Sequence, residues 1–180
     1  MGAYYYAVAA LPALSYGGKP AMEYEIFLEF MKDQLAPADF AVLEGVRLGE
    51  TGNKTGDKPA LTAWKRWELS LRNELVRQRA SRLRKDPEDY LETGEESLDP
   101  FKTAKEAFDA EDPLEAEERL DRSRWAYLEE LETGHYFDVE RLMIYSLKLQ
   151  LLERKGLRTR DEGIANFSGI LEKVESQNAQ

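Results

Sequence analysis

The sequence predicts an all-α fold, a single-domain helical bundle, on the basis of three observations. Apolar residues recur at helical spacing along most of the chain. Prolines and glycines stand where helices characteristically begin and end. The stretch Val139 to Leu152 is apolar on nearly every side, which indicates a helix enclosed by its neighbours. We therefore expect residues 1–175 to form one helical domain around this central helix, followed by a frayed tail at 176–180.

The N-terminal part of the chain predicts two helices and two irregular segments. Tyr4 to Ala10 is aromatic and apolar, and we expect a short strand or an extended lead-in there. A helix over Ala21 to Leu35 follows, because its apolar residues share one face, and Pro37 begins a second, shorter helix. Gly49 to Pro59 contains three glycines and few apolar groups, so it is the best candidate for a mobile loop.

A long helix is expected from Pro59 to about Lys85, with Trp64 and Trp67 on its apolar stripe as core residues. Asp-Pro pairs then predict helix starts, because Asp accepts hydrogen bonds from free N–H groups and Pro suits the first turn. These pairs are Asp86-Pro87, Asp99-Pro100 and Asp112-Pro113.

Glycines and one polar run predict the remaining helix ends. Gly94 and Gly134 each close a Leu-Glu-Thr-Gly run, which predicts two helix C-caps, and Gly156 ends the central helix. Thr159 to Glu162 has capping-box spacing and opens a last helix that contains Ile164 to Val174.

Composition excludes several classes of function. The net charge of -10 disfavours nucleic acid or an anionic membrane as a partner. The chain has no cysteine, so disulfides and thiolate chemistry are excluded. No apolar run approaches the roughly 18 residues of a membrane span, and the opening segment lacks the basic leader of a signal peptide. We expect a soluble, cytoplasmic protein without direct membrane insertion.

The residues that could carry chemistry form no pattern typical of catalysis, cofactor binding or metal binding. His135 is the only histidine, and a metal site near Asp138 and Glu140 would need further ligands, so we interpret it as a loop or cap residue. Gly52-Asn53-Lys54-Thr55 resembles the end of a phosphate-binding loop, but that loop requires glycine where Asn53 stands. We expect a protein that is not an enzyme, although a carboxylate site remains the alternative because acidic residues are abundant.

Charge is segregated along the chain. Lys65 to Lys85 holds eight basic residues and two acidic ones, whereas Asp86 to Asp121 holds fifteen acidic residues and three basic ones. The two segments could neutralise each other within the fold, or the basic segment could bind an acidic partner. The residues expected to bind such a partner are Arg77, Arg79, Arg82, Arg84 and Lys85.

Two parts of the sequence resemble proteins linked to rotary ATPases. Tyr4-Tyr5-Tyr6, Leu11-Pro12 and Met22 to Glu25 resemble a bacterial family of unknown function whose genes tend to lie among those for V-type ATPases. Tyr145 through Val174 is similar to the central-stalk subunit, called C or d, of the V/A-type ATPases, and so is the long helix. The residues that carry this second resemblance are Trp67, Glu68, Arg72, Asn73, Glu74, Leu75, Glu153, Leu157, Arg158 and 164–174.

The resemblance implies an all-helical, non-catalytic protein. The central-stalk subunit seats the rotating stalk on the membrane ring of proteolipid subunits and has no catalytic residues. A protein similar to it would have the V-type ATPase subunits of the central stalk and membrane ring as partners, would need no cofactor, and would lie in the cytoplasm at the periphery of the membrane. A free-standing cytoplasmic helical adaptor unrelated to the ATPase is the alternative.

Overall fold

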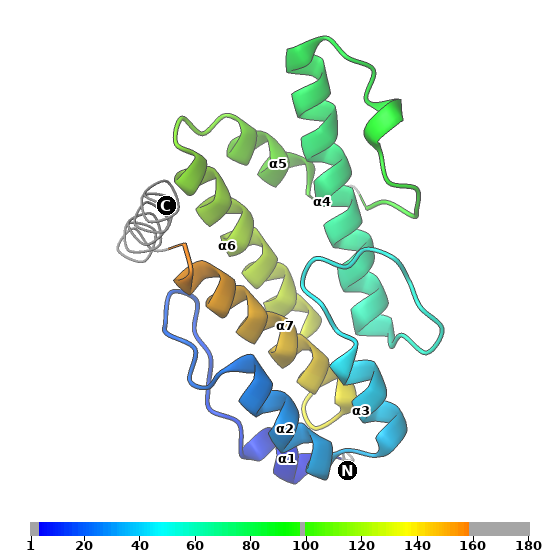
Figure 1. Cartoon of the computed structure of the whole chain (residues 1–180), viewed down its shortest axis with the longest axis vertical. Coiled ribbons are helices and arrows are strands. Elements are labelled where there is room, and N and C mark those ends of the chain that lie inside the picture. The colour runs from blue at the N-terminus through cyan, green and yellow to red at the C-terminus, as the bar shows by residue number, and fades with distance from the viewer. Residues whose placement is uncertain (1–3, 98–99, 159–180) are drawn as a thin grey trace, which may run out of the picture.

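The computed structural model describes residues 4–97 and 100–158, and every regular element within these ranges is helical (Figure 1). A short 3-10 turn, η1 (Glu88–Tyr90), separates the fourth and fifth helices. The α-helices are α1 (Tyr5–Ala9), α2 (Tyr24–Gln34), α3 (Pro37–Glu44), α4 (Pro59–Leu83), α5 (Phe101–Phe108), α6 (Pro113–Leu131) and α7 (Val139–Gly156). The predicted all-α fold is confirmed.

Helix α7 is the centre of the fold, as its sequence predicts. It packs against α2, α3, α4 and α6, which together cover it on several sides (Figure 1). Leu142, Leu149 and Leu151 are completely buried, and even the polar Ser146 is excluded from solvent. A helix enclosed in this way stabilises the fold mainly through the burial of apolar surface on all its faces.

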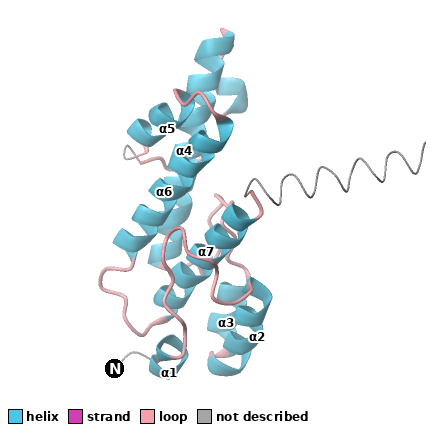
Figure 2. Ribbon diagram, turned by 90° about the vertical axis from the view of Figure 1, so that its left-hand side faces the viewer, coloured by secondary structure: helices cyan, strands magenta, loops and turns pink. Residues whose placement is uncertain are grey.

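The helices that pack on α7 lie on different sides of it. Helices α6 and α7 run side by side and are joined by a short connection, while α2 and α3 pack on another side of α7 (Figures 1 and 2). Helix α5 packs against both α4 and α6. The C-terminal half of α4 extends beyond α6 and α7 to the top of Figure 1. One end of the longest helix therefore projects from the bundle.

The two tryptophans on the expected apolar stripe lie in the core. Trp64 and Trp67 of α4 are almost fully buried, and their rings lie 5.8 Å apart. Tyr127 of α6 stacks on Trp67, with ring centroids 4.9 Å apart. This aromatic stack joins the N-terminal half of α4 to α6.

Several expected helix boundaries are confirmed. Asp112 caps α6, because its side chain accepts a hydrogen bond from the Leu114 N–H, and Pro113 occupies the first turn. Gly134 follows α6 with φ of 93°, a conformation that favours glycine. Helix α7 ends at Gly156.

The expectation of a strand or extended segment at Tyr4 to Ala10 is wrong, because residues 5–9 form helix α1. A strand needs a neighbouring strand for its backbone groups, and the described residues offer none. The segment instead satisfies its own N–H groups within a helical turn and places Ala7 in the core.

Two further expectations about the acidic segment are wrong. Asp86-Pro87 begins only the 3-10 turn η1, in which Asp86 accepts a hydrogen bond from the Glu88 N–H. Gly94 ends no helix and lies in an irregular segment that crosses α4. A Cβ atom there would meet Leu69 Cδ2 at 2.4 Å, so the glycine allows a close backbone approach.

Some expectations fall outside the described residues. These are Asp99 of the second Asp-Pro pair, the capping box at residues 159–162, the last helix and the frayed tail. Among the described helices, none is both long and apolar enough to cross a membrane.

We predict that Leu149→Ala lowers the free energy of unfolding by about 2–5 kcal/mol, because it removes a fully buried side chain from α7 and leaves a cavity. Leu157→Ala is the matched control, since Leu157 is 69% exposed and should change stability by less than about 0.5 kcal/mol. Urea denaturation followed by circular dichroism measures both. Equal losses in the two variants would contradict the central position of α7.

Candidate partner-binding surface

The projecting end of α4 carries most of the basic residues that the sequence predicts as a binding surface (Figure 1). We call Arg79, Arg82, Arg84 and Lys85 the basic tip. Arg84 ends the helix with φ of 55°, a left-handed conformation more typical of glycine. Its N–H and that of Lys85 bond back to carbonyl groups in the last turn, so the helix end is capped by its own backbone. All four residues are exposed.

Other basic residues of α4 pair with the returning acidic segment. After η1 the chain runs back along α4, where Arg77 Nη2 lies 2.9 Å from Glu96 Oε1. Arg66 pairs with Glu95 and Arg72 with Glu92, both at 3.4 Å. The interpretation that the segregated charges neutralise each other within the fold therefore holds for this part of α4.

Arg77 consequently differs from the other four predicted binding residues. The contact with Glu96 raises the pKa of Arg77, and the hydrogen bond from Arg77 lowers the pKa of Glu96. Arg77 donates two hydrogen bonds to Glu96, and Asn73 donates a third to Glu96 and one to the Glu92 carbonyl. Arg77 thus belongs to the set of contacts that hold residues 92–96 on α4, and we leave it out of the basic tip.

The basic tip has no carboxylate partner among residues 4–97 and 100–158. Arg82 lies over the Phe108 ring at 5.7 Å, and Lys85 lies over the Tyr90 ring at 5.9 Å. These cation–π contacts orient the two side chains and leave their charges uncompensated. Asp86, Glu88 and Asp89 follow in sequence but form no ion pair with the tip. The four cations are therefore available to a partner.

An apolar notch lies beside the basic tip. It has a volume of about 230 Å³ and is lined by Val76, Ala80, Leu83 and Tyr90, with Arg79 and Lys85 at its rim. Leu83 is 66% exposed and Tyr90 is 56% exposed. Exposed apolar groups surrounded by charged residues are typical of protein interaction sites.

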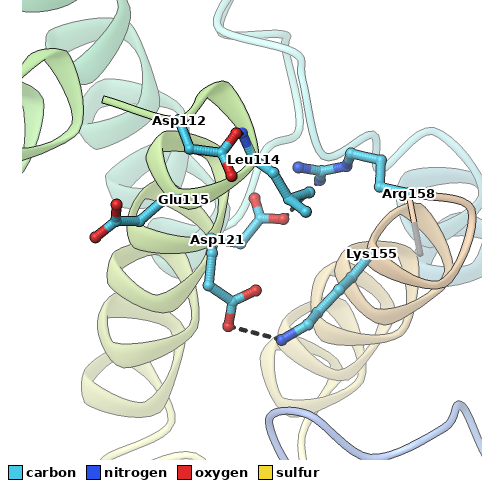
Figure 3. A pocket seen from close by; sticks show the side chains of 7 residues that line it. Asp112, Leu114, Glu115, Asp121, Lys155 and Arg158 are labelled. Atoms are coloured by element: carbon cyan, nitrogen blue, oxygen red, sulfur yellow. Dashed lines mark hydrogen bonds and ion pairs between the residues drawn. The ribbon is translucent and has the colours of Figure 1, made fainter. Parts of the chain in front are cut away.

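A second hollow lies between the start of α6 and the end of α7, and four carboxylates line it (Figure 3). It measures about 410 Å³ and opens between Asp112 and Glu115 on one side and Lys155 and Arg158 on the other. Figure 3 shows Lys155 of α7 and the following Arg158 directed toward the acidic side chains at the start of α6. This hollow allows the expected alternative, a carboxylate site, to be compared with the geometry.

Glu115, Glu118 and Asp121 of this hollow form ion pairs, and Asp112 caps α6. Glu118 accepts hydrogen bonds from Lys155 at 2.8 Å and from Tyr16 at 2.9 Å. Burial alone would raise the pKa of Glu118, but these hydrogen bonds outweigh it and lower the pKa. A general acid needs the opposite shift, so the environment of Glu118 suits an ionised structural group better than a proton donor.

A network of buried ion pairs lies beside this hollow and connects α4, α6 and α7. Arg124 of α6 donates two hydrogen bonds to Glu68 of α4, at 2.9 and 2.8 Å. Arg124 also contacts Asp121 at 3.2 Å, and Asp121 accepts further hydrogen bonds from Arg154 of α7 and from Arg158, which follows the helix. The side chains of Glu68 and Asp121 are 2% and 1% exposed. Each buried charge is therefore paired, as burial requires.

The sequence contains a signal for this network that our interpretation missed. Asp121 and Arg124 stand among the apolar residues Leu120, Trp125 and Leu128 on the buried face of α6. Charged residues on an otherwise apolar face are costly unless they pair, which indicates partners on neighbouring helices. The identity of those partners depends on the tertiary structure.

The other candidates from the sequence lie elsewhere. Lys54 forms an ion pair with Glu50, and its backbone N–H donates a hydrogen bond to Asp57. Lys65 of α4 donates hydrogen bonds to Asp57 and to the Gly52 carbonyl. The resemblance to a phosphate-binding loop thus has no structural counterpart, since no strand precedes it in the described chain. The mobility of this loop stays a prediction.

His135 lies in the connection between α6 and α7, as expected for a loop residue. Its Nδ1 atom is 2.8 Å from Asp138 Oδ2 and 2.9 Å from Glu140 Oε2. Asp138 also caps α7 through the Arg141 N–H. The structure therefore brings together the three groups that lie near one another in the sequence.

Comparison with known families adds one match to these features. The family described as a protein of unknown function (DUF2764) matches residues 84–178. The chain belongs to the DUF2764 family. The comparisons with curated proteins and with solved structures gave no match. The DUF2764 match contains Arg84 and Lys85 of the basic tip and the α6–α7 ion pairs, whereas α4 precedes it.

We predict that Asp121→Asn lowers the free energy of unfolding by about 3–5 kcal/mol, because it leaves the arginines around it without their shared buried carboxylate. Glu111→Gln is the control, since Glu111 is exposed and should change stability by no more than about 0.5 kcal/mol. Chemical denaturation near neutral pH measures the free energy of unfolding of both variants. If Asp121→Asn were as stable as the control, the network would not be a structural requirement.

Proposed function

We propose that this DUF2764 protein is a non-catalytic component associated with V/A-type ATPases, similar in role to the central-stalk subunit that joins the soluble rotor to the membrane ring. In this proposal it acts by binding other subunits. Force would pass through its helix–helix and protein–protein contacts, and no reaction centre is involved. The protein would lie in the cytoplasm, at the periphery of the membrane.

The observation that carries the proposal is the basic tip of α4. Four exposed cations gather at the projecting end of a helix whose other basic residues are mostly paired. The apolar notch beside them supplies surface that a partner can bury. Uncompensated charge next to apolar surface favours an acidic protein partner, because the charges guide association and the apolar contact adds affinity.

The association with the ATPase rests on the sequence resemblance. The described fold is all-helical, as the resemblance implies, and the similar segment begins within α7 at Tyr145. Glu153 of this segment accepts a hydrogen bond from the Tyr24 N–H at the start of α2. This contact couples the two parts of the chain that carry the resemblance.

An enzyme with a carboxylate site is less well supported. Such an enzyme needs an acidic group whose pKa is raised toward neutrality within a pocket. Among the described residues, the carboxyl groups with shifted pKa values are Asp39, Glu50, Glu96 and Glu118, and each of these shifts is downward. Ionised, paired carboxylates favour a structural role.

A free-standing adaptor unrelated to the ATPase would use the same surface. The identity of the bound partner therefore distinguishes the adaptor from the ATPase component. We predict that the tagged protein recovers V-type ATPase subunits from its native host at low salt, with recovery falling as salt rises because salt screens an electrostatic contact. Reversal of the whole basic tip, in Arg79→Glu, Arg82→Glu, Arg84→Glu and Lys85→Glu together, should reduce recovery at least tenfold.

The matched control reverses four other exposed lysines by the same total charge: Lys19, Lys32, Lys102 and Lys105. Recovery by the control should stay within about twofold of the wild type, and circular dichroism should show both variants folded. Recovery of no ATPase subunit by the wild type would favour the unrelated adaptor. Equal losses in both variants would contradict the assignment of the surface.

A further inference from the structure

The three polar side chains around the connection between α6 and α7 form a compact set of metal-ligand atoms. His135 Nδ1, one oxygen of Asp138 and one oxygen of Glu140 all lie within 4.8 Å of one another. Ligand atoms around a tetrahedral Zn²⁺ lie about 3.3 Å apart, given metal–ligand bonds of about 2.0–2.2 Å. The observed separations of 2.8 and 2.9 Å from His135 need to open by only a few tenths of an ångström.

His135 has too few protons to donate a hydrogen bond to both carboxylates that it faces. The Nδ1 atom of a histidine can carry one proton, and here it faces two carboxylate oxygens at hydrogen-bond distance. A neutral imidazole can therefore satisfy only one of the two. A divalent cation between the three atoms would contact both carboxylates and the imidazole nitrogen, and it would balance the two negative charges.

The surroundings orient the ligand atoms and leave them accessible. The second oxygen of Asp138 accepts the Arg141 N–H at 2.9 Å, and the second oxygen of Glu140 accepts the Ala60 N–H at 3.4 Å. Each carboxylate thus keeps its other oxygen for His135, which resembles the support that ligand side chains receive in metal sites. His135 also borders an open hollow of about 530 Å³, from which water can complete the coordination.

We propose that His135, Asp138 and Glu140 bind one divalent transition-metal ion of the Zn²⁺ class. Imidazole is a preferred ligand of these ions, and with two carboxylates it gives three ligands whose charge of two negative units a divalent cation neutralises, with one position left for water. The positive end of α7 opposes the cation, but the two carboxylates carry full charges at bonding distance and outweigh it. Metal binding would hold the α6–α7 connection against the first turn of α7. This proposal is independent of the partner-binding function.

The direct test uses the full chain without a histidine tag, so that His135 gives the only histidine ring signals in a proton NMR spectrum. We predict that Zn²⁺ shifts these signals and that the change is complete at one equivalent. Calorimetric titration should give one site with micromolar affinity. Unshifted ring signals at one equivalent, or no saturable heat, would overturn the proposal.

Variants identify the ligands. His135→Gln should weaken Zn²⁺ binding at least tenfold, and Glu140→Gln should weaken it similarly, whereas Asp89→Asn removes an exposed acid elsewhere and should leave the affinity within twofold. Because His135 lies outside the helices, its replacement should leave the melting temperature of the metal-free protein unchanged. This measurement shows that the variant is folded. Unchanged affinity in His135→Gln would show that Zn²⁺ binds only to surface carboxylates and would contradict the site.

Discussion

The buried ion pair between Glu68 and Arg124 is the interaction on which the arrangement of the helices depends. Two hydrogen bonds join the carboxylate of α4 to the guanidinium of α6, and Asp121 extends the contact to Arg154 of α7 and to the following Arg158. A buried charge without its partner is strongly unfavourable, so packings that separate these groups are disfavoured. The pairs therefore specify the position of α4 in the bundle, while the aromatic and aliphatic core supplies most of the stabilisation.

The position of α4 explains why one helix can serve both as core and as binding surface. Its first half is buried with Trp64 and Trp67, and its last turns project into solvent with the basic tip. The returning segment at residues 92–96 lies along the middle of α4 and pairs with Arg66, Arg72 and Arg77. These contacts support the helix up to the point where it leaves the bundle, and the cations beyond them have no carboxylate partner among the described residues.

Local signals in the sequence predicted most of the long helices, although the same kind of signal at Asp86-Pro87 produced only a 3-10 turn. The apolar positions of Val139 to Leu152 were sufficient to identify the central helix, and Asp112-Pro113 marked a helix start. It did not predict that Gly94 permits a close crossing over Leu69, since that role depends on the path of the folded chain. The binding surface also depends on the folded chain. Arg77 and Lys85 both belong to the basic segment of the sequence, but only Arg77 pairs with Glu96.

Contact between the end of α4 and an acidic partner can be measured by zero-length carbodiimide cross-linking, because this reagent joins lysine amines to carboxylates that touch them. In a V-type ATPase preparation containing the protein, we expect Lys85 to become linked to a carboxylate of an ATPase subunit. Lysines remote from the tip, such as Lys19 and Lys32, should give few links. A complex that forms but cross-links through these remote lysines, with Lys85 unmodified, would show that the basic tip is not the binding surface.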